Sequence, residues 1–427
     1  MIRWGLGPLI CPFSSRKLPA ARDRALWSLA VVAAAALMAG CAAPTSQLTQ
    51  GPSISELPSP PATPSTTTPR PSNLITPPPS AAPKISWDPT LGSVAEGQVR
   101  RIAVEAGAYW ALGFRSGATG AATQPMLWRS ADAEQWSPIE LPFPASIPRE
   151  TQWSVWAEHI VAIDGRLLVI GSASALDNLQ AVAWTSADGV AWTEIPPPPV
   201  YAVSDATAGP AGLVVATHGF AAGTGSAWRS TDGGGNWQER PPAAETIETD
   251  AVVGTPAGYL IAGASYRGSA YLPRIWGSTD GATWVEQALE SSEMPGRVEA
   301  VTVDGAGQWV AAGTLDGKPA SWLSMDGKAW DLPDPSALAD AQRQTLLWRL
   351  AGLPAGFILI DAAGSTWGSR DGKAWSRLDA VPSGFRGENA AGVGRIGARV
   401  VIIDNVHPFA TGAAQEGWRI AVGTAQP

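Results

Sequence analysis

Cysteine and histidine are nearly missing from this sequence of 427 residues. The only cysteines, Cys11 and Cys41, precede residue 42, so the rest of the chain can form neither a structural disulfide nor a cysteine-ligated zinc site. The three histidines are His159, His218 and His407, and no two of them have the His-x-x-x-His spacing. The composition therefore gives little basis for a zinc enzyme.

Charged residues are also scarce, at 15% of the chain, and their balance is acidic. The net charge is −8, and residues 1–41 hold five of the bases but one acid, which leaves 24 bases and 36 acids (−12) in the remainder. An acidic surface is a poor match for a phosphate backbone, so we expect no nucleic-acid partner.

The N-terminal segment has the pattern of a targeting signal. Basic residues between Arg16 and Arg24 precede an apolar run over 25–38, which is too short to span a bilayer comfortably. The run ends in Leu37-Met38-Ala39-Gly40-Cys41, which resembles the bacterial lipobox, with Met38 where that pattern prefers Leu. The resemblance implies a lipoprotein signal peptide over 1–40 and a diacylated Cys41. An ordinary signal peptide with a chance cysteine is the alternative.

A segment rich in proline, serine and threonine follows over 41–84. Residues 42–84 contain 12 Pro and 14 Ser or Thr, with only three charged residues. Such a composition buries too little apolar surface to fold, so we expect a disordered tether of at most about 130 Å. With the lipid anchor, it predicts a protein held outside the cytoplasm at a membrane of the cell envelope.

Tryptophan is in excess, with 21 residues, and most belong to a repeat that begins after residue 84. Six segments read Trp-x-Ser-x-Asp-(Gly)-x-x-Trp, and their serines are 56, 44, 48, 46 and 45 residues apart. The Ser, Asp and second Trp of the segments are Ser130, Asp132, Trp136; Ser186, Asp188, Trp192; Ser230, Asp232, Trp237; Ser278, Asp280, Trp284; Ser324, Asp326, Trp330; and Ser369, Asp371, Trp375.

These segments resemble the Asp-box, or BNR, repeat of sialidase-like and sortilin-like β-propellers. The segment Ser230 to Trp237 has the usual spacing, with Asn236 in place of Thr, and the other five are one residue shorter. Ser and Asp side chains bind turn amides and Gly permits positive φ, so we expect the motif to shape a hairpin turn. The Asp residues are accordingly interpreted as structural and not as catalytic.

Each repeat of about 45 residues has room for four short strands, which is one propeller blade. After the sixth motif three strand-like segments remain, and residues 85–91 supply the missing fourth. Trp87 and Trp418 then form a seventh Trp pair that is divided between the two ends of the domain. We therefore predict an all-β, seven-bladed propeller over 85–427, with four-stranded blades and a ring that the segment 85–91 closes on the C-terminal blade.

A candidate site emerges when the repeats are aligned on their first strands, which line the channel of a propeller. The aligned positions are Arg100, Glu158, Asp205, Asp250, Glu299, Trp348 and Glu388. Five of the seven are acids, and acids gathered at one mouth would raise one another's pKa or attract a divalent cation or a cationic ligand. The alternative is that they are polar strand ends facing water. No other cofactor is expected, and whether a metal binds is left open.

For function, we favour a non-enzymatic binding or assembly module, expected to be monomeric, for a protein or glycan partner. The alternative is a sialidase-like exo-glycosidase, the activity of one family that carries the repeat. The Arg-Ile-Pro motif of sialidases is missing, and none of the five tyrosines carries a recognisable nucleophile signature. An arginine cluster facing a Tyr–Glu pair or paired carboxylates in the channel would favour the hydrolase.

Overall fold

The computed structural model describes residues 83–426, except for residues 91, 95, 118–121, 149–152, 176–177, 219–223, 244–245, 334–337, 339–340, 342–348, 362, 379–380, 382–389 and 407–416. The predicted signal peptide, Cys41 and most of the predicted tether lie outside the described residues. Within the described part, no helix is long and apolar enough to cross a membrane.

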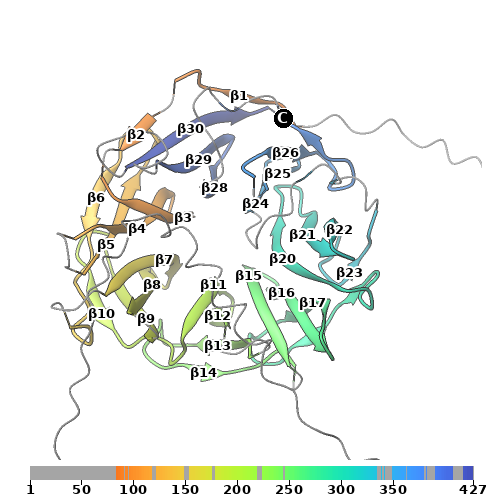
Figure 1. Cartoon of the computed structure of the whole chain (residues 1–427), viewed down its shortest axis with the longest axis horizontal. Helices are drawn as coiled ribbons and strands as arrows, with labels where there is room; N and C mark the ends of the chain where they lie inside the picture. The colour runs from red at the N-terminus through yellow and green to blue at the C-terminus, as the bar shows by residue number, and fades with distance from the viewer. Residues whose placement is uncertain are drawn as a thin grey trace, which may run out of the picture. The chain divides into compact units, whose positions relative to one another are not determined.

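Seven blades of antiparallel strands follow one another around a ring (Figure 1), which confirms the predicted propeller. The first three blades consist of β3 (Gln98–Glu105), β4 (Ala108–Arg115), β5 (Gln124–Ser130) and β6 (Ser137–Glu140); β7 (Ser154–Ile163), β8 (Arg166–Ala175), β9 (Asn178–Ser186) and β10 (Thr193–Ile195); and β11 (Ala202–Gly209), β12 (Gly212–His218), β13 (Ser226–Ser230) and β14 (Gln238–Glu239).

The next three blades consist of β15 (Ile247–Thr255), β16 (Gly258–Arg267), β17 (Ala270–Ser278) and β18 (Val285–Glu286); β20 (Gly296–Val303), β21 (Trp309–Leu315), β22 (Lys318–Ser324) and β23 (Ala329–Trp330); and β24 (Arg349–Gly352), β25 (Phe357–Ile360), β26 (Thr366–Ser369) and β27 (Ser376–Arg377). In the fifth blade, β23 is joined to β22 through the bridge between Leu323 and Asp331, and β19 (Ala288–Leu289) pairs with β23 in parallel.

The seventh blade closes the ring with strands from both ends of the domain. It contains β28 (Ala390–Ile396), β29 (Arg399–Val406) and β30 (Gly417–Ala425), and β1 (Ile85–Trp87) pairs antiparallel with β30. The prediction that 85–91 completes this blade is confirmed, and β2 (Gly92–Val94) adds a second pairing farther along β30. The predicted pairing of Trp87 with Trp418 is wrong, because Trp87 lies opposite Gly423 of β30 and Trp418 lies opposite Val94. Trp418 instead meets Trp136 of the first blade edge to face, with ring centroids 5.1 Å apart.

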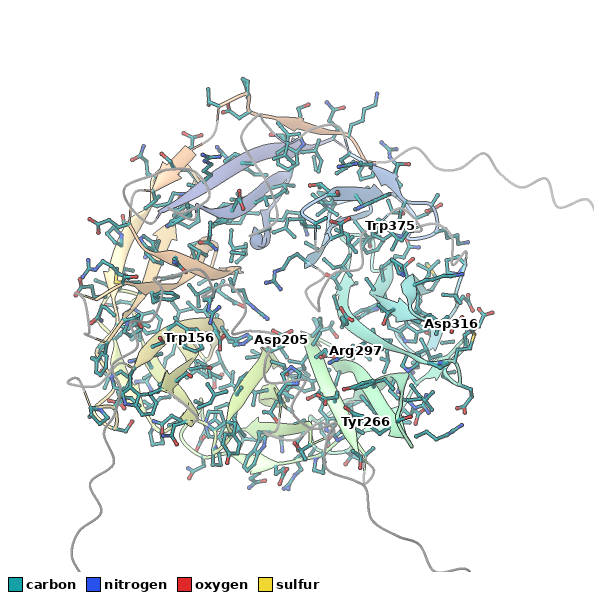
Figure 2. All side chains as sticks on the ribbon, in the orientation of Figure 1. Trp156, Asp205, Tyr266, Arg297, Asp316 and Trp375 are labelled. Carbon is teal, nitrogen blue, oxygen red and sulfur yellow. The ribbon has the colours of Figure 1, made fainter. Side chains whose placement is uncertain are left out.

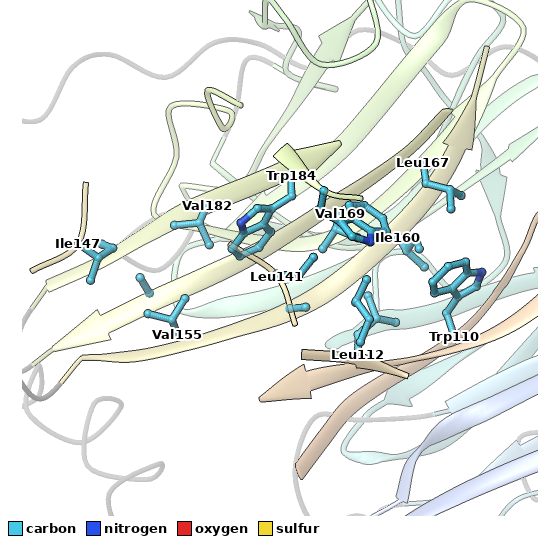
Figure 3. Close-up of a cluster of buried hydrophobic side chains, with 14 of the residues drawn as sticks. Trp110, Leu112, Leu141, Ile147, Val155, Ile160, Leu167, Val169, Val182 and Trp184 are labelled. Carbon is cyan, nitrogen blue, oxygen red and sulfur yellow. The ribbon is translucent and has the colours of Figure 1, made fainter. Parts of the chain in front are cut away.

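Hydrophobic side chains fill the spaces between neighbouring blades. Between the first two blades, Trp110 and Leu112 of β4 pack against Val155, Val169 and Trp184 (Figure 3), all of them buried. Six tryptophans of the predicted pairs are less than 2% exposed: Trp128, Trp184, Trp276, Trp322, Trp330 and Trp418. Aromatic rings of this size contribute much of the buried apolar area, so packing accounts for the tryptophan excess.

The repeated motifs form the turns between the third and fourth strands. In the fourth blade, Ser278 Oγ donates to Asp280 Oδ1 (3.0 Å) and accepts from the backbone N–H of Gly281 (2.8 Å). Asp280 Oδ1 also accepts from the N–H groups of Ala282 and Thr283, and these bonds lower the pKa of Asp280 to about 2. The Ser–Asp bond recurs in all six motifs, at 2.8–3.3 Å. Because the strands are antiparallel, these turns lie at the end of the ring where the first strands finish.

Candidate functional site

The first strands of six blades carry a β-bulge at the same place. The extra residue is Arg100 in β3, Glu158 in β7, Ser204 in β11, Asp250 in β15, Glu299 in β20 and Ala391 in β28. A bulge interrupts the alternation of side chains along a strand. Successive residues, such as Ser204 with Asp205, therefore both line one cavity at the centre of the ring.

Glycine on the second strand makes room for the bulge in four blades. These residues are Gly113, Gly171, Gly263 and Gly313, and a Cβ at any of them would lie 1.9–2.1 Å from a carbonyl oxygen of the first strand. No real Cβ contact is that short, so only glycine fits without a shift of one strand. The repeated glycine is a sequence signal for the bulge, and the sequence analysis did not use it.

The bulges correct the alignment of the repeats. Arg100, Glu158, Asp250 and Glu299 are equivalent, as predicted, but the equivalent residue of β11 is Ser204 and not Asp205. In the seventh blade it is Ala391, three residues beyond the predicted Glu388. Trp348 and Glu388 themselves lie outside the described residues.

The central cavity has a volume of about 240 Å³ and is lined by first strands of six blades. It brings together three of the predicted residues, Asp205, Asp250 and Glu299, near the N-terminal halves of their strands. Its lining does not include Arg100 or Glu158, the other two predicted residues that the structure describes. The Arg100 guanidinium stacks over the Trp156 ring, 4.6 Å from its centroid, and Glu158 accepts a hydrogen bond from Ser172 (2.7 Å).

Three arginines that the sequence analysis missed, Arg101, Arg297 and Arg349, lie in or beside this cavity, so its charge is mixed and not purely acidic. Figure 2 shows Asp205 and Arg297 at the inner side of the ring. Arg297 stands two residues before the aligned Glu299, and Arg101 and Arg349 stand one residue after the aligned Arg100 and Trp348. An alignment of single positions overlooks such neighbours.

Asp205 is held by a cation from another blade. Arg101 Nη1 donates to Asp205 Oδ1 at 2.5 Å, and Nδ1 of the buried His159 lies 3.5 Å from the same oxygen. His159 Nε2 donates to the backbone oxygen of Val203 (3.2 Å), which leaves Nδ1 facing the carboxylate. Burial by itself raises the pKa of Asp205, but Arg101 and His159 outweigh it and lower the pKa to about 2.

Asp250 forms the second internal ion pair. Arg297, on the first strand of the next blade, binds it with both Nε and Nη2, and the Nε to Oδ2 distance is 2.9 Å. Burial nevertheless keeps the pKa of Asp250 above its usual value, and Arg297 opposes this only in part. Beside this pair, His218 Nδ1 lies 3.2 Å from Glu248 Oε2, and Tyr266 donates to Glu248 Oε1 (3.2 Å).

Arg349 and Glu299 remain without such partners. The Nε of Arg349 and the Oε2 of Glu299 are buried, and neither atom has a hydrogen-bond partner in the described part of the chain. Burial lowers the pKa of Arg349 to about 10, helped by the charge of Arg101 and opposed only in part by that of Asp205. Burial, with a smaller effect of Asp250, raises the pKa of Glu299 to about 7 against the opposing charge of Arg297.

Among the residues that the structure describes, no group of three or more His, Cys, Asp or Glu side chains is arranged to hold a metal ion. The carboxylates of the cavity face arginine and histidine instead. The arrangement can bind charged groups of a ligand through Arg349 and Glu299, each of which has a buried polar atom without a hydrogen-bond partner among the described residues.

No protein-family model matches the chain, and no curated protein matches it in sequence. Among solved structures, YCF48 bound to D1 peptide is 16% identical, with a TM-score of 0.49 and coverage of 81% of this chain and 98% of that one. The phage phi92 endosialidase is 10% identical (TM-score 0.43; 81% and 69%), as is the β-propeller domain of the Trilobed protease from Pyrococcus furiosus (0.47; 77% and 94%). Likenesses this distant assign neither a family nor a function to the chain.

Proposed function

We propose that this chain is a non-enzymatic binding or assembly module whose central cavity takes up a carboxylate group presented by a protein or glycan partner. The observation that supports it is Arg349, whose guanidinium reaches the cavity wall with a buried Nε that has no acceptor among the described residues. A buried charge without a partner is costly, and a carboxylate that binds guanidinium through two parallel hydrogen bonds relieves that cost.

The surroundings of Arg349 favour an anion over a neutral ligand. The charge of Arg101 contributes to the lowered pKa of Arg349, so the two cations lie close enough to repel each other. Asp205 binds Arg101 directly and neutralises it. Asp205 also attracts Arg349 but makes no ion pair with it, so an anion beside Arg349 would find a cation with no directly bound carboxylate and a second cation nearby.

The sialidase-like alternative receives less support from the same geometry. The described cavity does combine arginines with carboxylates, but Arg101 and Arg297 are already bound to Asp205 and Asp250 and are not free to grip a substrate. The Tyr266–Glu248 pair resembles a nucleophile and base, yet the pKa of Tyr266 is raised, mainly by burial, and a nucleophile needs the opposite.

The experiment is thermal unfolding of the purified protein with propionate, glucuronate and N-acetylneuraminate, and with the uncharged amide of each as its control. A ligand at 100 times its dissociation constant stabilises a protein by about 2.7 kcal/mol. We expect at least one acid to raise the unfolding temperature, its amide to have no effect, and Arg349→Met to abolish the shift. Equal shifts with the amides, or a shift retained in Arg349→Met, would contradict the proposal, and turnover of a sialoside would establish the alternative.

We also propose that Cys41 is lipidated and that the propeller is displayed outside the cytoplasm at the cell envelope. The lipobox-like sequence and the position of this thiol, which no other cysteine follows, support the proposal. Cys41→Ser should abolish incorporation of labelled fatty acid and release the protein from the membrane fraction, while Cys11→Ser, the matched control, should change neither. A labelled Cys41→Ser protein would disprove it.

A further inference from the structure

The cavity contains a second charge that the fold leaves unsatisfied. Glu299, from β20, belongs to the blade next to that of Arg349, and both side chains line the cavity. Its Oε2 is buried and has no hydrogen-bond partner in the described part of the chain. The two groups have opposite charge, yet they do not form an ion pair with each other.

We propose that the cavity recognises an amino-carboxylate, a group that carries an ammonium and a carboxylate together as an α-amino acid does, with the carboxylate at Arg349 and the ammonium at Glu299. This inference rests on the proposed function, because it assigns a ligand class to the same site. It goes further by requiring a cation in the ligand.

The charges of the cavity support a ligand of this kind. Arg101 is neutralised by Asp205, and Arg297 by Asp250. One cation, Arg349, and one acid, Glu299, then remain, each with a buried polar atom that has no hydrogen-bond partner among the described residues. A simple carboxylate would bind Arg349 but be repelled by Glu299. A zwitterion binds both groups and leaves the site without net charge.

The size of the cavity also limits the ligand. Its volume of about 240 Å³ lies below the range of about 300–1,000 Å³ that is usual for pockets binding drug-sized molecules. The cavity therefore suits a single amino acid or one terminal group of a larger partner, and it is too small for an oligosaccharide.

Proton binding by Glu299 should make the affinity for the ligand depend on pH. With its pKa near 7, this acid is only partly ionised at neutral pH. The charged and titratable groups around it are Arg297 on its own strand, Asp250 and Glu248 on β15, His218 on β12 and Arg349 on β24. An ammonium binds the ionised form, so affinity for an amino acid should rise about tenfold from pH 6 to pH 8. Affinity for a simple carboxylate should fall over the same range, because the ionised acid repels it.

The test is isothermal titration calorimetry of the full chain with the twenty common α-amino acids. The best binder is then compared with its analogue lacking the amine and with its amide, which lacks the carboxylate. We expect both analogues to bind at least tenfold more weakly at pH 8. Glu299→Gln should remove the advantage of the amino acid over the amine-free acid, and Arg349→Met should abolish binding of both. Glu158→Gln, a matched change on the bulge of a blade that does not line the cavity, should change nothing.

The outcomes separate the two proposals. If amine-free acids bind as tightly as amino acids, the amino-carboxylate inference is wrong and the carboxylate-binding function stands. If no carboxylate of either kind binds, both are wrong. Amino-acid binding that survives Glu299→Gln and Arg349→Met would place the site elsewhere and overturn the inference.

Discussion

Replacement of Arg349 by methionine should make the ligand-free protein more stable. Burial lowers the pKa of Arg349 from 12.5 to about 10, which means that the folded state holds this cation less favourably than the unfolded state does. At neutral pH the group is charged in both states, so the whole penalty is present. A pKa difference of this size corresponds to about 3 kcal/mol. Methionine keeps an unbranched apolar stem like the aliphatic part of arginine and removes the charged guanidinium, and the gain should raise the unfolding temperature by about 4 °C.

The neighbouring Arg297 provides a control with the opposite sign. Arg297→Met removes the same charge, but it leaves Asp250 buried without its bidentate partner. Breaking a buried ion pair in this way costs about 3–5 kcal/mol. The lower end is expected here, since the pKa of Asp250 is already raised and the group can take up a proton. Calorimetric unfolding of the two variants beside the parent, at pH 7 without ligand, measures both effects.

The result that would refute this reasoning is a loss of stability in Arg349→Met comparable with that in Arg297→Met. Arg349 would then have a partner within the protein, and the observation behind the proposed function would disappear. A gain in stability together with a loss of ligand binding is the pattern of a site that holds an unfavourable charge for its ligand.

Three further predictions concern the charge, the bulge and the closure of the ring. Burial raises the pKa of Glu299 and that of Glu105 to about 7, so ionisation of each acid lowers the stability of the fold as pH rises from about 4.5 through 7. The unfolding temperature should therefore fall over this range, and Glu299→Gln and Glu105→Gln should each make the fall smaller. Unchanged pH profiles of the unfolding temperature would contradict the assignment. Gly263→Ala should cost about 1–3 kcal/mol in chemical unfolding, because its Cβ would lie 2.0 Å from a carbonyl oxygen, while Gly92→Ala, with an ordinary 3.4 Å contact, should cost nothing measurable. Deletion of residues 83–94 removes β1 and β2, the two strands on the outer side of β30, and exposes that edge, so it should lower the unfolding temperature and promote aggregation in light scattering. A deletion as stable as the parent would show that closure does not depend on these strands.

The architecture could be predicted because the sequence repeats it. Each motif places a Ser, an Asp and two Trp at fixed spacing, and the turn hydrogen bonds and interblade packing follow from those few residues. The closing strand could be found because the last repeat lacked its fourth strand, although the tryptophans used to support it, Trp87 and Trp418, do not pair with each other. Repetition gives several independent observations of one local structure.

The ion pairs of the cavity could not be predicted in this way. Asp250 and Arg297 are 47 residues apart, close to one repeat, but Arg101 and Asp205 are 104 apart and lie on blades that are not sequence neighbours. Contacts across the channel depend on how far each side chain reaches into the centre. The repeat period contains no information on that distance.

The two misaligned positions have a common physical cause. In β4, β8, β16 and β21 a glycine faces the first strand beside the bulge, and in each of those blades the sequence alignment found the bulge residue. In β12 the place of that glycine is taken by Thr217, and in β29 by Asp404; these are the blades where the alignment missed Ser204 and Ala391. An alignment on the glycines instead of the acids identifies the third and seventh blades as irregular. The third blade contributes Asp205 and His218 to the cavity. The departure from the repeat therefore coincides with part of the proposed site, and local sequence rules are expected to fail where residues serve a site instead of the fold.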